Sequence, residues 1–358
     1  MDNRIRVIVL GTGRMGAGIG RLVLEKQGLE LVGAYGRRAQ RAGMDLGRAM
    51  GLERNLNMEL SGDLAALIEQ TRPRIAIQAT CSKITDAREE IVTLIRHGVH
   101  VISIAEEMAY PCCRSPSFAE KIHELAIAHD VGILGTGINP GFILDLLIIT
   151  LTGVCSDIQS ISATRVNDLS PYGPSVLASQ GVGLKREDFM KGLKNGTVAG
   201  HFGFPESIHM IADVLGWHIE RIEESREPII SRIRRETPFV TVEPGQVAGC
   251  FHKAVAYRQD KPVISLIHPQ QIHPQLEEVK TGDSIEINGT PNVHLRGSPE
   301  IPGGPATCGL AVNMIPRLLN AAPGLHCMAD LPVPAAIMGD VRSLIHKKLC
   351  LPTNFSHN

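Results

Sequence analysis

The sequence predicts an α/β protein in two parts: an N-terminal Rossmann domain on a doubly wound parallel sheet, and a C-terminal α+β domain with a mixed or antiparallel sheet. Three observations predict this. Up to residue 140, continuous apolar segments alternate with amphipathic helical segments. A glycine-rich loop joins the first apolar segment to the first helical one. Beyond residue 140, strand-like segments are separated by turns instead of helices.

Strand and helix signals follow one another regularly in the first part. Gly28 is suited to end the first helix, and Asp63 is suited to cap a later, short one. Alternation of this kind builds a parallel sheet with helices on both faces. We expect strands over residues 6–10, 29–35, 74–78, 99–104 and 131–134, and helices over residues 15–27, 63–69, 86–96 and 117–129.

Beyond residue 140, strand and helix signals no longer alternate regularly. A run rich in proline and glycine, residues 299–305, predicts a loop, and two helical segments follow it. We expect strands over residues 246–257, 262–268 and 283–288, and helices over residues 142–151, 186–193, 206–215, 307–319 and 335–346. The predicted domains are residues 1–140 and 141–306, with C-terminal helices in residues 307–358 packing back on the first domain.

The amino-acid composition limits the kinds of binding partner that the protein is expected to have. Among 358 residues, 36 lysines and arginines balance 37 aspartates and glutamates, so the chain carries no field that would attract nucleic acid or an anionic membrane. No apolar run is long enough to cross a bilayer, and no secretory signal is recognised at the start, which predicts a cytoplasmic protein. The spacing of cysteine and histidine predicts no metal site. A small-molecule substrate is the expected partner.

The glycine-rich loop predicts a dinucleotide site. It follows a buried strand and opens a helix, which is the context in which G-x-G-x-x-G binds a pyrophosphate. Gly11 permits the tight turn, Gly13 lets the backbone approach the phosphates, and Gly16 lets the helix pack against the strand. The helix N-terminus holds the phosphates. The predicted cofactor residues of this loop are Gly11, Thr12, Gly13, Arg14, Met15 and Gly16.

The end of the second strand bears on the choice of cofactor. An NAD site places an aspartate or glutamate there to bind the ribose 2′-hydroxyl, whereas this chain has Gly36, Arg37 and Arg38. Two guanidinium groups are available for a 2′-phosphate. We therefore expect NADP, or use of both NADP and NAD. The alternative is that both arginines are merely solvated.

The ends of the later strands supply the candidate chemistry. Thr80 follows the strand at 74–78 and is predicted to contact the cofactor. Glu106 and Glu107 follow the strand at 99–104 and are the predicted catalytic pair. Crowding of like charges and partial burial would raise the pKa of one carboxyl towards neutrality, which suits proton transfer. The alternative is an acidic corner exposed to solvent.

Three residues are predicted to bind the substrate. Asn139 begins the helical segment after the last strand of the first domain, and its amide can donate and accept hydrogen bonds. Arg165 ends a strand of the second domain and could hold a carboxylate. His268 could orient the substrate. The alternatives are a hinge at Asn139 and a structural loop histidine at His268.

Several motifs resemble the 2,4-diaminopentanoate dehydrogenase family, some of whose members act as amine dehydrogenases. The resemblance covers nearly the whole chain and is densest outside residues 165–200. The same family is related to dihydrodipicolinate reductases and homoserine dehydrogenases. The segments that carry the resemblance are residues 106–111, 135–142, 203–207, 268–271, 299–304 and 329–334.

The resemblance implies NAD(P)-dependent oxidative deamination of a small amino-acid amine, with 2,4-diaminopentanoate giving 2-amino-4-oxopentanoate and ammonia. The chain lacks the His-His-x-x-Lys stretch of dihydrodipicolinate reductases, and Glu106-Glu107 stands where homoserine dehydrogenases carry Asn-Lys. A carboxylate suits an amine, because it attracts an ammonium group and accepts its proton.

Two other functions stay open at this point. One is reduction of a cyclic imine or aldehyde on the same scaffold, and the other is a non-catalytic NADP-binding sensor. A homodimer built through the sheet of the second domain is also expected.

Overall fold

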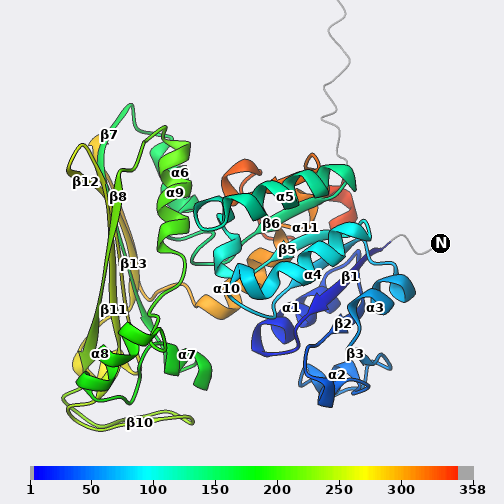
Figure 1. Ribbon diagram of the computed structural model, residues 1–358, viewed down its shortest axis with the longest axis horizontal. Coiled ribbons are helices and arrows are strands. Elements are labelled where there is room, and N and C mark those ends of the chain that lie inside the picture. The colour runs from blue at the N-terminus through cyan, green and yellow to red at the C-terminus, as the bar shows by residue number, and fades with distance from the viewer. Residues whose placement is uncertain (1–3, 346–358) are drawn as a thin grey trace, which may run out of the picture. The chain divides into compact units, whose positions relative to one another are not determined.

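The computed structural model describes residues 4–345 and divides the chain into two compact units (Figure 1). Unit 1 combines the chain up to Gly137 with the segment from Gly304 onward, and unit 2 comprises Ile138–Gly303. Across residues 4–345, the helices are too short or too polar to cross a membrane.

Unit 1 is a seven-stranded parallel sheet with the strand order β15-β6-β5-β4-β1-β2-β3. The strand order reverses between β1 and β4, and ligands of doubly wound sheets bind at the carboxyl ends of strands beside such a switch point. The strands are β1 Ile5–Leu10, β2 Leu29–Tyr35, β3 Leu60–Ser61, β4 Ile75–Gln78, β5 His100–Ser103, β6 Gly132–Gly135 and β15 Gly324–His326.

The helices of unit 1 follow from the apolar spacing of their sequences. On α4, for example, Ala87, Ile91 and Leu94 recur at helical spacing and are fully buried in a core shared with α3 and α5. The α-helices are α1 Arg14–Glu25, α2 Leu46–Ala49, α3 Leu64–Thr71, α4 Ile84–Arg96, α5 Pro116–Ala128, α10 Gly303–Asn313 and α11 Ile315–Leu319, and the 3₁₀ turns are η1 Ala39–Arg41, η2 Glu106–Met108, η3 Pro111–Cys113, η5 Met328–Asp330 and η6 Val341–Leu344.

Unit 2 is built on a six-stranded mixed sheet with the order β14-β13-β7-β12-β11-β8, in which only β7 and β12 pair in parallel. Its strands are β7 Asp157–Asp168, β8 Arg221–Ile230, β11 Val247–Arg258, β12 Lys261–Gln271, β13 Gly282–Thr290 and β14 Val293–Gly297, with a separate pair β9 Arg235–Glu236 and β10 Thr241–Val242. Its helices are α6 Leu146–Thr152, α7 Pro174–Ser179, α8 Arg186–Asn195 and α9 Phe204–Val214, with the turn η4 Pro274–Glu277.

The predicted fold class is confirmed in both units, and most predicted elements lie within a few residues of the observed ones. The predicted helix over residues 142–151 begins only at Leu146, because the side chain of Asp145 caps it there. The predicted helix over residues 307–319 is divided into α10 and α11. Strands β3, β8, β9, β10, β14 and β15 were not predicted. Among them, β8 is a charged edge strand that contains Pro228, so it lacks the apolar pattern of a central strand.

The predicted helix over residues 335–346 is wrong as far as Ile345; the last residue of that prediction lies outside the described residues. Here the backbone is irregular and ends in the turn η6. Its polar groups are satisfied by distant partners, because Ile337 donates its amide to Asn313 and accepts a hydrogen bond from Lys26. Gly339 further disfavours a helix at this point.

Candidate functional site

The glycine loop lies between β1 and α1, and each glycine has a different surrounding. Gly11 has a φ of +95°, and a Cβ on it would lie 2.6 Å from the carbonyl oxygen of Ala79. A Cβ on Gly16 would lie 1.8 Å from the carbonyl oxygen of Gly11. Around Gly13, by contrast, a Cβ would meet nothing within 4 Å. The loop is thus packed on its protein side and open at Gly13, where the N-terminus of α1 presents its first amides.

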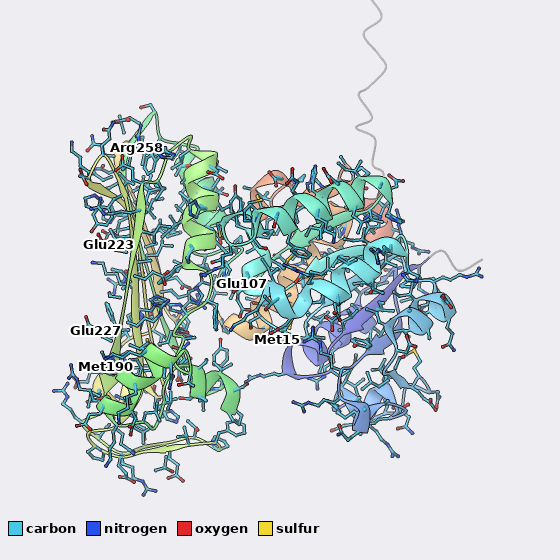
Figure 2. All side chains as sticks on the ribbon, in the orientation of Figure 1. Met15, Glu107, Met190, Glu223, Glu227 and Arg258 are labelled. Atoms are coloured by element: carbon cyan, nitrogen blue, oxygen red, sulfur yellow. The ribbon has the colours of Figure 1, made fainter. Side chains whose placement is uncertain are left out.

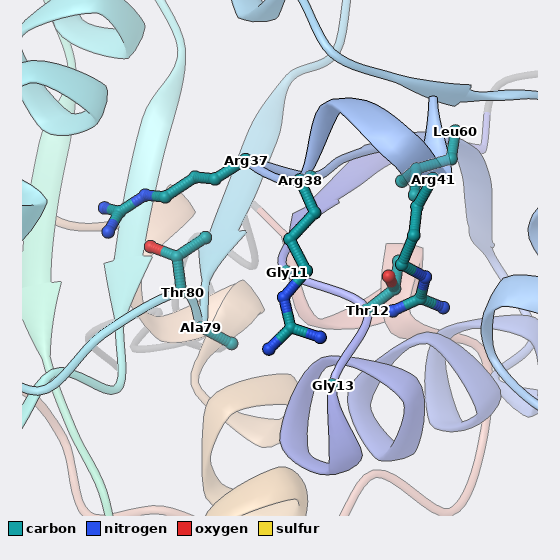
Figure 3. Close-up of a pocket in the computed structure, with 10 residues that line it drawn as sticks. Gly11, Thr12, Gly13, Arg37, Arg38, Arg41, Leu60, Ala79 and Thr80 are labelled. Carbon is teal, nitrogen blue, oxygen red and sulfur yellow. The ribbon is translucent and has the colours of Figure 1, made fainter. Parts of the chain in front are cut away.

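A pocket of about 250 Å³ opens beside this loop (Figure 3). Of the predicted cofactor residues, Gly11, Thr12, Gly13, Arg37, Arg38 and Thr80 line it. Arg14 and Met15 form the first turn of α1, with Met15 labelled in Figure 2, and Gly16 supports the loop from within. The pocket is also lined by Gly36, Arg41, Leu60 and Ala79. A glycine cradle with three basic side chains fits the phosphates of a dinucleotide.

A buried carboxylate that was not predicted from the sequence lies behind this pocket. Glu90, on α4, is 6% exposed and accepts hydrogen bonds from Arg37 Nε at 2.7 Å and from Thr80 Oγ1 at 2.6 Å. Gln78 joins the same network through Thr80 Oγ1, at 2.7 Å. Glu90 falls on the apolar face of α4, between Ala87 and Ile91, and an acid at such a position was the available signal.

The two predicted catalytic glutamates lie in η2, directly after β5, and both are half-buried. A carboxylate oxygen of Glu107, which is labelled in Figure 2, accepts a hydrogen bond from the amide of Ile84 at 2.8 Å. Ile84 is the first residue of α4. The backbone amide of Glu107 donates to the carbonyl of Ser82. Glu107 therefore ties its loop to the positive end of α4. This contact gives Glu107 a structural role in addition to the role predicted for the pair.

The three predicted substrate residues belong to unit 2. Asn139 Nδ2 lies 3.3 Å from His268 Nδ1, and His268 Nε2 lies 3.0 Å from Asn167 Oδ1. Arg165 is instead committed to a buried ion pair with Asp283, at 2.5 Å, and donates to the carbonyl of Ile301. The structure thus joins Asn139 and His268, while the guanidinium of Arg165 already holds a carboxylate of the protein.

Two further histidines surround this pair and were missed by the sequence analysis. The ring of His201 lies 4.8 Å from that of His268, and its backbone amide donates to His252 Nδ1 at 3.1 Å. His252 Nε2 meets Glu224 at 3.0 Å. Two buried atoms of the cluster, His201 Nε2 and Asn139 Oδ1, have no hydrogen-bond partner in the described part of the chain. Buried polar atoms of this kind are normally paired, so both are suited to a polar ligand.

Burial disfavours the protonated form of these histidines. Desolvation lowers the pKa of His268 and of His201 well below the usual range, and neighbouring histidines and Arg165 act in the same direction. Desolvation also lowers the pKa of His252, against the opposing effect of Glu224. An uncharged His268 that accepts from Asn139 through Nδ1 carries its proton on Nε2 and donates it to Asn167.

The free energy of unfolding is expected to fall as the pH drops from 8 to 5. Because the folded pKa of each histidine is depressed, the unfolded chain takes up protons first, below about 6.5, and each histidine lowers stability by at most about 1.4 kcal/mol per pH unit. Urea unfolding at several pH values measures this slope. His268→Gln should flatten the slope, whereas His294→Gln, at a side chain that is 72% exposed, should leave it unchanged. Equal slopes in all three proteins would contradict this account.

Comparison with known proteins places the chain in a family. Residues 142–347 match the family described as "2,4-diaminopentanoate dehydrogenase C-terminal domain". The chain belongs to the 2,4-diaminopentanoate dehydrogenase family. It is 44% identical to the 2,4-diaminopentanoate dehydrogenase of Acetoanaerobium sticklandii over 347 residues, which cover 96% of this chain and 98% of that protein. Residues 5–103 match the family described as "Dihydrodipicolinate reductase, N-terminus".

Two amine dehydrogenases are also similar to this member of the family. The amine dehydrogenase of Streptomyces virginiae is 25% identical over 360 residues, covering 93% of this chain and 98% of that protein. The structure of the amine dehydrogenase from Mycobacterium smegmatis superposes with a TM-score of 0.83 at 27% identity, covering 93% of this chain and 97% of that one. The predicted family is confirmed, and so is the class of enzyme, an oxidoreductase that uses a nicotinamide cofactor.

Proposed function

We propose that the chain catalyses the NAD(P)-dependent oxidative deamination of 2,4-diaminopentanoate at C4. The observation that carries this proposal is the 44% identity to a 2,4-diaminopentanoate dehydrogenase over 96% of the chain. The reaction consumes the diamine, NAD(P)⁺ and water and yields 2-amino-4-oxopentanoate, an ammonium ion, NAD(P)H and a proton. The glycine cradle and its arginine-lined pocket support a dinucleotide in unit 1.

Proton transfer falls to Glu106 in this proposal. Glu107, its neighbour in the predicted pair, also holds the loop and the start of α4, because its carboxylate accepts a hydrogen bond from the amide of Ile84. Glu106 takes the proton from the C4 ammonium group, which leaves a neutral amine on the reacting carbon. A dinucleotide held at the glycine loop would supply the acceptor for the hydride of that carbon. After that proton has passed to solvent, Glu106 accepts a proton from the water that adds to the imine and returns it to the departing ammonia, so one carboxylate acts in turn as base and acid.

Recognition of the amino-acid end of the substrate is proposed for the histidine cluster of unit 2. Asn139 Oδ1 can accept from the C2 ammonium group, and His268 and His201 add ring nitrogens beside it. Arg165 acts here as a positioning residue, because Asp283 and Ile301 already occupy its guanidinium. A polar group of the substrate would satisfy His201 Nε2 and Asn139 Oδ1, which are otherwise buried without partners among the described residues.

A homodimer through the sheet of unit 2 is also proposed, and a cytoplasmic location stays a prediction. Along β11, Ala254 and Ala256 are fully buried on the side that packs against α9, whereas Lys253 and Val255 on the other side are only half-buried. Glu223 of the edge strand β8 lies on that second side (Figure 2). A second copy would cover this face, and light scattering of the purified protein measures the mass.

Reduction of NADP⁺ and NAD⁺ with 2,4-diaminopentanoate, beside ornithine and homoserine, tests the proposed function. Turnover with the diamine and release of ammonia are the expected results, read at the nicotinamide absorbance and by an ammonia assay. Turnover with homoserine alone would indicate that the protein catalyses the reaction of homoserine dehydrogenases instead. Binding of the dinucleotide with no turnover of any amine would indicate a sensor.

A further inference from the structure

We propose that Glu90 gives the three arginines of the dinucleotide pocket two different roles in cofactor binding. Arg38 and Arg41 bind the 2′-phosphate of NADP. The charge of Arg37 is neutralised by Glu90, and its side chain lines a part of the pocket that NADP and NAD both occupy. The inference rests on the proposed binding of a dinucleotide at the glycine loop. It assigns Arg41 and Glu90 to cofactor selection, which the pattern of the glycine loop does not reveal.

Three contacts engage the guanidinium of Arg37, although its side chain is 38% exposed and lines the pocket. Its Nε meets Glu90 at 2.7 Å, and one terminal nitrogen donates to the carbonyl of Asp86 at 2.5 Å and lies 3.6 Å from Cys81 Sγ. The side chain of Glu90 is only 7% exposed, so its negative charge is poorly screened by water and stays close to the guanidinium. The ion pair as a whole is neutral, and a neutral pair offers a 2′-phosphate little attraction.

Arg38 and Arg41 carry positive charges without a carboxylate partner in the described residues. Arg38 is exposed, and no hydrogen bond fixes its guanidinium there. Arg41 donates through one nitrogen to the carbonyl of Ala49 at 2.7 Å, and its charge stays uncompensated. In Figure 3 both side chains turn towards the loop of Thr12 and Gly13, whereas Arg37 turns away towards Thr80.

The residue after β2 is not the acid that would repel a 2′-phosphate in an NAD site. Gly36 stands where an NAD site would place an acid, and it lines the pocket together with Leu60. A phosphate bound here would meet two uncompensated guanidinium groups and no carboxylate lining the pocket. Guanidinium groups bind phosphate through paired, charged hydrogen bonds, so this arrangement favours NADP.

The test measures the Kd of NADP⁺ and of NAD⁺ by calorimetry on the full chain without any amine. Arg38→Gln and Arg41→Gln should each raise the Kd of NADP⁺ roughly tenfold to a hundredfold and leave the Kd of NAD⁺ nearly unchanged. Glu90→Gln keeps the hydrogen-bond acceptor but frees the charge of Arg37, so preference for NADP⁺ should increase. A purely structural role of Glu90 would weaken both dinucleotides equally.

The double variant Arg37→Gln/Glu90→Gln tests whether the Arg37–Glu90 pair contributes to the preference for NADP⁺, because it deletes the ion pair without changing the net charge. Its preference for NADP⁺ should match that of the wild type. Arg48→Gln, on α2 and outside the pocket lining, is the control for the loss of one nearby positive charge and should also preserve the preference. A double variant that loses the preference as fully as Arg41→Gln would overturn the inference, as would a wild type that binds both dinucleotides equally. A wild type that binds neither would count against the proposed function itself.

Discussion

Replacing Glu106 with glutamine should lower kcat for oxidation of the diamine by about a hundredfold to ten-thousandfold, which is the usual contribution of a general base. Glutamine keeps the size and polarity of the side chain but cannot accept the ammonium proton. The substrate would then stay charged, and the carbon could not release its hydride. Cofactor affinity should be preserved, because Glu106 does not line the dinucleotide pocket. Steady-state kinetics and calorimetry with NADP⁺ measure the two quantities.

Glu107→Gln is the matched control for this prediction. Its amide oxygen can still accept the hydrogen bond from Ile84, so the start of α4 should remain capped. Most of the turnover should survive, with at most a small decrease in thermal stability. The opposite pattern, in which the Glu107 variant is inactive and the Glu106 variant is active, would reverse the assignment. Full activity in both variants would show that neither glutamate is the general base.

Gly16→Ala should destabilise unit 1 by about 3 kcal/mol, as overpacking in a tight site does. The new Cβ would lie 1.8 Å from the carbonyl oxygen of Gly11, and a backbone atom in a tight turn cannot move aside as a flexible side chain can. Alanine favours a helix over glycine by only about 1 kcal/mol, which does not offset the clash. Urea unfolding followed by circular dichroism measures the loss.

Gly13→Ala separates folding from binding at the same loop. A Cβ at Gly13 meets nothing within 4 Å, so stability should be close to that of the wild type. Affinity for NADP⁺ and NAD⁺ should fall together, because the methyl group would occupy the space through which the pyrophosphate approaches the backbone. A Gly13 variant that binds both dinucleotides normally would place the phosphates elsewhere, and a stable Gly16 variant would refute the packing argument.

The parts of the local structure that were predicted correctly are encoded by residues close together in the sequence. The glycine loop, its preceding strand and its following helix lie within a single short segment, so spacing alone identified them. The acid cap at Asp63 was predicted for the same reason, and its side chain accepts from Ala66. Local patterns of this kind do not depend on the rest of the fold.

The parts that were missed are created by tertiary contacts. Glu90 meets Arg37 across 53 positions of the chain, and Arg165 meets Asp283 across 118, so neither pair has a local signal. His201 becomes part of the histidine cluster only because α9 and β12 bring its ring to His268. The segment before η6 was mistaken for a helix because its distant partners, Asn313 and Lys26, do not appear in a local pattern.

The most direct test of the proposed function uses 2,4-diaminopentanoate labelled with deuterium at C4. We expect the deuterium to move to the nicotinamide, ammonia to be released in equal amount, and the organic product to be 2-amino-4-oxopentanoate, all measured by mass spectrometry. Turnover that leaves the deuterium on C4, or that releases the C2 amine, would contradict the proposed function.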